Sequence, residues 1–125
     1  KGDKYVLDLD NMSVVATKHG EERRFRHKGP GGKGMKISKD SIVASITKAM
    51  GEIMQDYANG EIGNNEPFTI KAKQGKQPML NIVAALEMQP GPDQIKIITV
   101  MRKDDFKTDN FSKSGKAQRE YPVTI

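Results

Sequence analysis

Apolar residues recur at helical spacing from Ser38 to about Ala58, and this amphipathic pattern constrains the fold more than any other feature of the chain. Ser38 is a natural N-cap, and Asp40 falls in the first turn, where the helix dipole favours a negative charge. The dipeptide Asn59-Gly60 is typical of a helix end. The apolar positions are Ile42, Val43, Ile46, Met50, Ile53, Met54 and Tyr57. The pattern predicts one long helix with a single apolar face.

After this helix the apolar residues indicate β-strands instead. Phe68 to Lys73 alternates apolar and polar residues, Met79 to Glu87 is rich in Ile, Val and Leu, and Ile95 to Met101 is mostly apolar. We interpret these runs as three strands. The connections between them, residues 74–78 and 88–93, are short and contain Gly and Pro. We therefore expect neighbouring strands to pair as antiparallel hairpins.

Two outer segments complete the expected fold. Tyr5 to Val15 has mixed apolar spacing, which fits a strand or a short helix. Tyr121 to Ile125 could form a further strand, and Pro122 favours the edge of a sheet. The sequence thus predicts a single α+β domain over residues 1–125, with an N-terminal helix or strand and one main amphipathic helix packed on an antiparallel sheet of three to five strands. The sheet face away from the helix would be free to bind a partner.

The charge of the chain favours a polyanionic partner. Lys and Arg number 21 against 16 Asp and Glu, and the sequence pI is about 9.4. The basic residues cluster between Lys18 and Lys39 and again between Arg102 and Lys116, which favours a phosphate-bearing ligand such as RNA. A mixed, solvated surface is the alternative interpretation. Because the chain has no Trp and 6% aromatic residues, we do not expect extensive base stacking.

Composition also excludes several classes of site. The chain has no Cys, which excludes disulfides, a thiol nucleophile and thiolate zinc sites. Two histidines are too few for an all-histidine zinc site, and no segment has calcium-loop spacing, so we expect no metal and no cofactor. No run approaches a membrane span of about 20 apolar residues, and no signal-peptide pattern is present, so we expect no membrane contact. Since the chain begins at Lys1, we expect it to be part of a longer protein.

The stretch from Lys28 to Gly34 combines lysines with glycines and could contact phosphate. Glycines let backbone N–H groups approach an anion, and lysines supply positive charge. The stretch lacks the spacing of a nucleotide-binding P-loop, so a loop that contacts an RNA backbone, or a plain flexible connection, is expected instead. The RNA-binding candidates are Arg26, Lys28, Lys33, Lys36 and Lys103.

His27 lies between two basic residues and is the natural candidate for acid or base catalysis at neutral pH. Cleavage of RNA by its own 2′-hydroxyl needs a base, an acid for the leaving 5′-oxygen, and cations that stabilise the phosphorane. His19 could supply the second proton-transfer group. The alternative is that both are surface histidines without a role.

The end of the most apolar strand carries two further catalytic candidates. Thr99 could position a phosphate oxygen through its hydroxyl, and Arg102 could hold the same phosphate by charge. In a regular strand Thr99 shares a face with Ile95 and Ile97, whereas Arg102 points to the other face unless a bulge intervenes. An ordinary strand threonine and a solvated strand end are equally compatible with the sequence.

The order of helix and strands resembles the barnase, EndoU, colicin and RelE-like ribonuclease superfamily, whose members are often toxin domains. The resemblance covers roughly residues 25 to 107 and is mostly one of fold. It is carried by His27, by Ile37 to Val43, Phe68 to Lys71 and Leu80 to Leu86, and by Ile98 to Phe106.

The resemblance implies a metal-independent endoribonuclease toxin that cleaves RNA, with transfer RNA as the expected target, on the concave face of the sheet. His27, Thr99 and Arg102 match the catalytic residue types. The chain lacks an obvious glutamate on a central strand, so either His27 or Glu87 could be the base. A non-catalytic basic module that binds nucleic acid is the alternative function.

The resemblance also implies a delivery route and an inhibitor. Such toxin domains are carried by larger secreted or phage-borne proteins, as in contact-dependent growth inhibition, and act in the cytoplasm of a target cell. The producing cell is protected by an immunity protein. Because the domain is basic, we expect an acidic immunity protein that covers the surface around Lys28, Lys33, Arg102 and Lys103.

Overall fold

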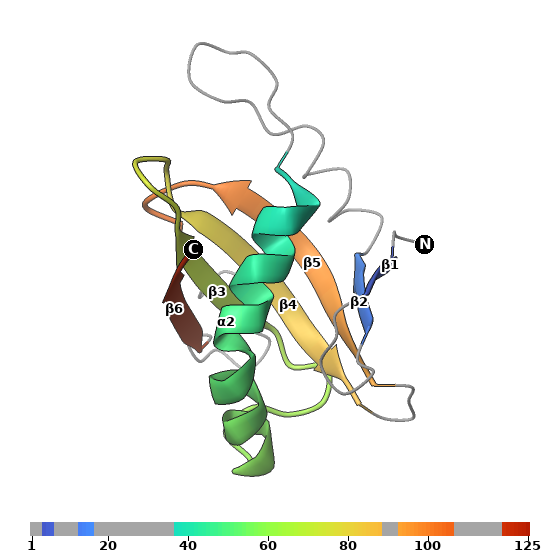
Figure 1. The fold of residues 1–125 in the computed structure, drawn as a ribbon. Coiled ribbons are helices and arrows are strands. Elements are labelled where there is room, and N and C mark those ends of the chain that lie inside the picture. Colours follow the sequence, from blue (N-terminus) through green and yellow to red (C-terminus); the bar gives the residue numbers. More distant parts are fainter. Residues whose placement is uncertain (1–3, 7–12, 17–36, 89–92, 107–118) are drawn as a thin grey trace.

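The computed structural model describes residues 4–6, 13–16, 37–88, 93–106 and 119–125. These residues form one long helix, α2 (Lys39–Ala58), and six strands of one sheet (Figure 1). The strands are β1 (Lys4–Val6), β2 (Ser13–Ala16), β3 (Phe68–Lys73), β4 (Leu80–Glu87), β5 (Gln94–Arg102) and β6 (Glu120–Thr124). The predicted main helix and the strands after it are therefore confirmed, each within a residue or so of its expected ends.

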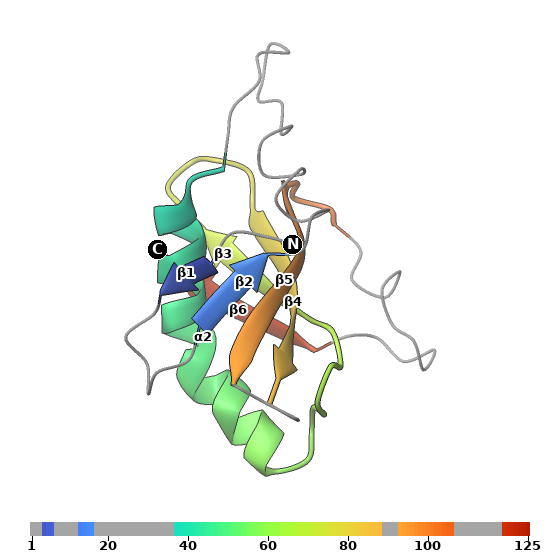
Figure 2. The same ribbon diagram turned by 90° about the vertical axis from the view of Figure 1, so that its right-hand side faces the viewer.

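The strands follow the order β1-β2-β5-β4-β3-β6, and α2 lies across one face of the sheet (Figures 1 and 2). The pairs β1·β2, β4·β5 and β3·β4 are antiparallel. The pairs β2·β5 and β3·β6 are parallel. The predicted α+β class, with one main helix on a mostly antiparallel sheet, is confirmed. The described part of the sheet has six strands where three to five were expected, because the N-terminal segment contributes two short strands and β6 joins the opposite edge.

The ends of α2 form as their local signals predict. The Ser38 hydroxyl accepts a hydrogen bond from the backbone N–H of Ser41 at 3.1 Å, which satisfies one of the free N–H groups of the first turn. At the other end the Asn59 backbone N–H donates to the carbonyl of Gln55 at 3.0 Å. Gly60 follows with a φ of +78°, a conformation that glycine adopts without strain.

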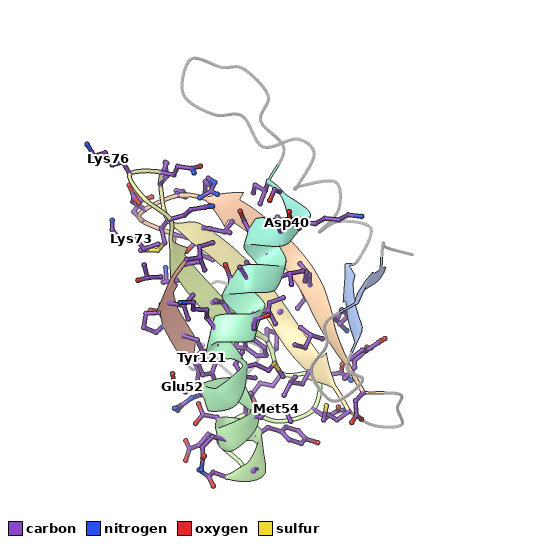
Figure 3. The ribbon with its side chains drawn as sticks, in the orientation of Figure 1. Asp40, Glu52, Met54, Lys73, Lys76 and Tyr121 are labelled. Carbon is purple, nitrogen blue, oxygen red and sulfur yellow. The ribbon has the colours of Figure 1, made fainter. Side chains whose placement is uncertain are left out.

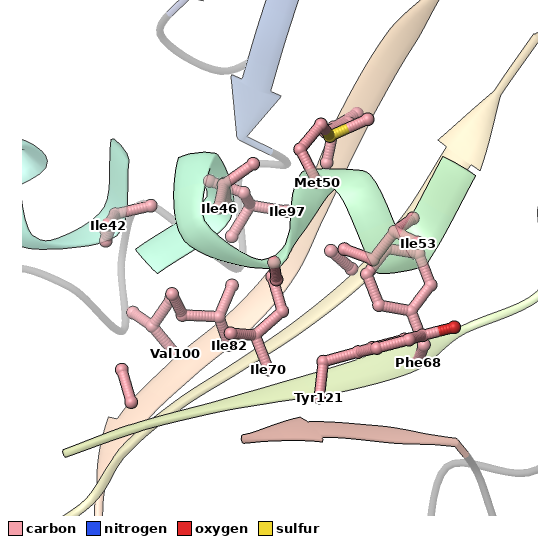
Figure 4. Packing of buried hydrophobic residues seen from close by; sticks show 14 of the residues in the cluster. Ile42, Ile46, Met50, Ile53, Phe68, Ile70, Ile82, Ile97, Val100 and Tyr121 are labelled. Atoms are coloured by element: carbon pink, nitrogen blue, oxygen red, sulfur yellow. The ribbon is translucent and has the colours of Figure 1, made fainter. Parts of the chain in front are cut away.

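The core lies between α2 and the sheet (Figure 4). Helix residues such as Ile46 and Ile53 are fully buried and face strand residues such as Ile70, Ile82 and Ile97, which are at most 1% exposed. Burial of these apolar side chains favours folding, because apolar area removed from water is the largest favourable contribution.

A β-bulge changes the course of β5 near its C-terminal end. Val83 of β4 pairs with Thr99, whereas the next residue, Ala84, pairs with Ile97, so Ile98 is the additional residue on β5. Before the bulge Ile97 packs in the core beneath α2, and after it Val100 does. Thr99 therefore does not share a face with Ile97, as expected for a regular strand, and points to the face opposite α2, called the far face below.

Candidate functional site

One edge of the molecule brings together the start of α2 and several strand ends, and we call it the α2 N-terminal edge. The turn between β3 and β4, residues 74–79, contacts the first turn of α2 through Gln74, and the C-terminal end of β5 contacts the same β3–β4 turn through Arg102. Two hydrogen bonds join Gln74 to the Ser41 hydroxyl, at 3.4 Å from the amide oxygen and 3.2 Å from the amide nitrogen. Its polar and charged residues are Ser38, Lys39, Asp40, Ser41, Lys73, Gln74, Lys76, Gln77, Arg102, Lys103, Asp104 and Asp105.

Arg102 is the most constrained cation of this edge. Its guanidinium donates one hydrogen bond to the carbonyl of Pro78 at 3.1 Å and a second, short one to the side-chain oxygen of Gln74. Both acceptors are neutral, and no ion pair joins Arg102 to a carboxylate among the residues that the structure describes. Burial lowers the pKa of the Arg102 guanidinium, but arginine stays charged at neutral pH. The edge thus holds a half-buried positive charge whose described partners carry no negative charge.

Exposed lysines surround Arg102. Lys39, Lys73, Lys76 and Lys103 are all exposed at this edge, and Figure 3 shows Lys73 and Lys76 at the end of the sheet where α2 begins, with Asp40 nearby. Three acidic residues accompany the cations. One of them, Asp104, accepts a hydrogen bond from the backbone N–H of Met79 at 2.9 Å, and is therefore engaged in holding the turn. The balance of charge at the edge is positive.

The other end of the described body is mostly acidic. The α2 C-terminus, the loop that follows it and the ends of β4 and β6 carry Asp56, Glu61, Glu66, Glu87, Asp93 and Glu120, with Lys96 and Arg119 as the cations. The described residues contain ten basic and ten acidic side chains in total, so the net charge of +5 comes from the segments outside them. Within the described body, positive charge is concentrated at the α2 N-terminal edge.

The described residues on either side of the basic segment between β2 and α2 are Ala16 and Ile37, and they bear on where that segment starts and ends. Ile37 immediately precedes the first turn of α2. Ala16 ends β2, which runs parallel to β5 and therefore toward the edge where Arg102 lies. The candidates on this segment, His19, Arg26, His27, Lys28, Lys33 and Lys36, fall outside the described residues. Only the two flanks of the segment are placed, and both are directed to the α2 N-terminal edge.

Thr99 and Arg102 do not share a site. Thr99 points to the far face and is 2% exposed, whereas the Arg102 side chain contacts the turn and the α2 side of the sheet. The hydroxyl of Thr99 is buried and finds no hydrogen-bond partner within the described ranges. The structure therefore brings Arg102 and Lys103 to the candidate site and leaves Thr99 in the interior.

Glu87, the alternative base, lies at the opposite end of β4 from Arg102. Glu87 pairs with Gln94, and Arg102 pairs with Leu80, so the two are separated by almost the length of the strand, about 23 Å at a strand rise of about 3.3 Å per residue. A hydrogen bond from Gln94, and then the nearby Lys96 at 3.2 Å, lower the pKa of Glu87. Glu87 is a stable carboxylate that cannot act on a phosphate held by Arg102.

A second polar cluster was missed by sequence reasoning. The buried Asp56 carboxylate accepts hydrogen bonds from the Tyr121 hydroxyl at 2.8 Å and from the Arg119 guanidinium at 2.9 Å. Burial raises the pKa of Tyr121, with the Asp56 hydrogen bond as the next cause. Phe68 packs edge-on against the Tyr121 ring, with 5.5 Å between centroids. Because these polar groups are paired with one another, the cluster fastens β6 to the C-terminal end of α2. The sequence signal for this cluster was Asp56, a polar residue on the apolar face of the predicted helix.

No group of three or more His, Asp or Glu suited to a metal ion occurs in the described ranges. The described helix is not long and apolar enough to cross a membrane. Comparisons of the chain with protein-family models, with curated proteins and with solved structures give no match.

Proposed function

We propose that the protein is an endoribonuclease domain that binds the RNA backbone at the α2 N-terminal edge. Arg102 would hold the phosphate that reacts, and exposed lysines would contact neighbouring phosphates. The observation that carries the proposal is the half-buried guanidinium of Arg102, which is held by Pro78 and Gln74 and has no carboxylate partner in the described part of the chain. A buried charge is costly unless an opposite charge compensates it, and a phosphate would supply that charge.

The geometry suits a phosphodiester better than a single small anion. Lys103 follows Arg102 in the chain, and Lys73 and Lys76 lie in or next to the turn whose Gln74 holds Arg102, so several exposed cations share the edge. Such a set suits a chain of phosphates rather than one. The first turn of α2 adds the partial positive charge of a helix N-terminus. The resemblance to metal-independent ribonucleases supports RNA as the polyanion.

In the proposed reaction His27 is the group that transfers protons at the reacting phosphodiester. His27 belongs to the basic segment between β2 and α2, whose described flanks are directed to this edge. An imidazole can take the proton of the 2′-hydroxyl or give one to the leaving 5′-oxygen, and His19 is the candidate for the second of these steps. Arg102 would stabilise the charge that develops on the phosphorane oxygens. Thr99 has no part in the proposed site, because it is buried on the far face.

The test compares Arg102→Ala with Lys48→Ala, which removes the same charge from an exposed position of α2 away from the edge. We expect Arg102→Ala to weaken RNA binding about 10- to 100-fold, the effect of a charge-assisted phosphate contact, and Lys48→Ala to change it less than about twofold. Cleavage of total RNA in EDTA, with 2′,3′-cyclic phosphate ends, is expected for the wild type. Equal affinities of the two variants would reject the proposed site.

A non-catalytic nucleic-acid-binding module is the second candidate. It is favoured by the same observation, since a half-buried guanidinium and exposed lysines can bind a phosphate backbone without any proton-transfer group. The two functions differ in the effect of His27→Ala. An endoribonuclease should lose about 100-fold or more in rate with little change in affinity, whereas a binding module has no rate to lose.

As a toxin domain, the protein would be delivered by a larger protein to the cytoplasm of a target cell and would need an inhibitor. A positive edge is most readily covered by an acidic immunity protein, with carboxylates where the RNA phosphates would lie, around Lys28, Lys33, Arg102 and Lys103. Association would then slow steeply as salt is added, since screening weakens long-range attraction. A partner whose association rate is indifferent to salt would contradict this mode of inhibition.

A further inference from the structure

Asn81 carries a fully buried side-chain amide on the far face of β4, and it pairs with Met101 near the C-terminal end of β5. The side chain of Asn81 is polar, yet it is 0% exposed, like the apolar residues Leu80 and Ile82 on either side of it. Its side-chain nitrogen, which carries two hydrogens, lies within hydrogen-bond distance of three backbone carbonyls, those of Met79 at 3.1 Å, Met101 at 3.3 Å and Lys103 at 2.8 Å. Its side-chain oxygen accepts from the amine of Lys71 at 3.2 Å. Each polar atom of this amide is thus engaged.

Two of these carbonyls belong to the residues on either side of Arg102. The backbone N–H of Lys103 also donates to the carbonyl of Met79 at 2.9 Å, so the same three residues close the last part of the β4·β5 ladder. Asn81 therefore fixes the backbone of Arg102 from the far face, while Pro78 and Gln74 fix its guanidinium on the other side. Arg102 is held at both ends.

Lys71 supports this arrangement from β3. Besides Asn81, its amine donates to the carbonyl of Phe106 at 3.1 Å and lies 5.7 Å from the centre of the Phe106 ring. Lys71 thereby joins the amide of Asn81 to the chain that follows β5. Burial of an amide and part of a lysine costs free energy that an apolar pair would not, so the arrangement calls for a role in which precise placement matters.

We infer that Asn81 is a positioning residue that holds Arg102 where it binds phosphate, an inference that depends on the proposed function of the edge. Asn81 does not touch the RNA itself. It acts through the two carbonyls that flank Arg102, and its loss would leave the guanidinium present but less well placed. Misplacement of a phosphate-binding group by even about 1 Å weakens the contact and slows any reaction at that phosphate.

The positioning itself can be measured without RNA. In Asn81→Leu we expect hydrogen exchange of the Lys103 backbone N–H to become at least about tenfold faster, because its hydrogen bond to Met79 loses support. Thr99→Val is the matched control, since it also removes a buried polar group from the far face but contacts none of these carbonyls; exchange at Lys103 should stay unchanged. If Asn81→Leu does not fold, Asn81→Ser keeps a single donor and should show a smaller acceleration.

The link to Arg102 is tested by a double-mutant cycle on RNA affinity. Alone, Asn81→Leu should weaken binding about fivefold or more; in the Arg102→Ala background it should weaken binding less than about twofold, because there is no guanidinium left to position. A merely structural role predicts that the two losses multiply, and that result would overturn the inference.

Failure of the inference and failure of the proposed function give different results. If Arg102→Ala binds RNA as the wild type does, the proposed edge is wrong, whatever Asn81 does to hydrogen exchange. If Arg102→Ala loses affinity but Asn81→Leu changes neither hydrogen exchange at Lys103 nor binding, the edge stands and Asn81 is not a positioning residue.

Discussion

The buried hydroxyl of Thr99 gives a prediction whose magnitude follows from the structure. This side chain is 2% exposed, and its hydroxyl has no hydrogen-bond partner among the residues that the structure describes. A buried polar group without a partner costs about 1–3 kcal/mol of desolvation, and valine has nearly the same shape with a methyl group in place of the hydroxyl. We therefore expect Thr99→Val to raise the free energy of unfolding by about 1 kcal/mol.

Thermal unfolding converts that energy into a shift of Tm. For 125 residues the entropy of unfolding is about 0.26 kcal/mol per degree, at about 2.1 cal/mol/K per residue, so about 1 kcal/mol corresponds to an increase of about 4 °C. Urea unfolding should give the same gain with an unchanged m-value.

The control for this prediction is Thr69→Val. Thr69 is equally buried on the far face, but it has an interaction partner, so its replacement should give no gain in stability. A loss of more than about 1 kcal/mol in Thr99→Val would refute the reasoning, since it would show that the Thr99 hydroxyl is bound in solution.

Three further changes test other parts of the structure. Gly51 is exposed in the middle of α2 and an added Cβ would meet nothing within 4 Å, so Gly51→Ala should add up to about 1 kcal/mol in urea unfolding; a loss would show that this helix face needs the glycine. Tyr121→Phe removes the hydrogen bond to Asp56 and should cost about 1–2 kcal/mol, whereas an unchanged Tm would mean that Asp56 is satisfied without it. The pKa of Glu87 lies below its ordinary value of 4.5, chiefly because of the hydrogen bond from Gln94, so the contribution of the Glu87 carboxylate to stability is present at neutral pH and is lost as the pH falls through the lowered pKa. The difference in unfolding free energy between wild type and Glu87→Gln should therefore disappear below that pKa. A difference that persists at pH 2 would contradict this.

Local signals were sufficient to predict the helix and the central strands. Ser38 and Asn59-Gly60 determine the ends of α2 through contacts within a few residues. Each central strand is bounded by a turn with Gly or Pro, and hairpins between such strands follow from short connections. The parallel pairings of β2 and β6 could not be predicted in this way, because their partners are far away in the sequence and no local signal specifies them.

The candidate site could be predicted in residue type but not in arrangement. Arg102 was a candidate because it ends an apolar strand, and the structure adds the neutral acceptors that hold it. The bulge at Ile98 changed the face of Thr99, and a one-residue shift of this kind leaves no mark in the apolar pattern. Asn81 was overlooked, although a polar residue inside a run of buried apolar residues was a usable signal.

The net positive charge of the chain lies outside the described residues, and this distribution affects how the proposed site would bind RNA. The described residues carry equal numbers of basic and acidic side chains, while residues 17–36 alone are strongly basic. Affinity for RNA, and its dependence on salt, would therefore come mainly from residues 17–36, because each neutralised phosphate releases counterions whichever cation meets it. Arg102 would add one specific contact to that total and would decide which phosphate lies against the first turn of α2, since its position is fixed from both sides by Gln74 and Asn81. Most of the salt dependence of binding and the choice of the reacting phosphate would thus reside in different parts of the chain.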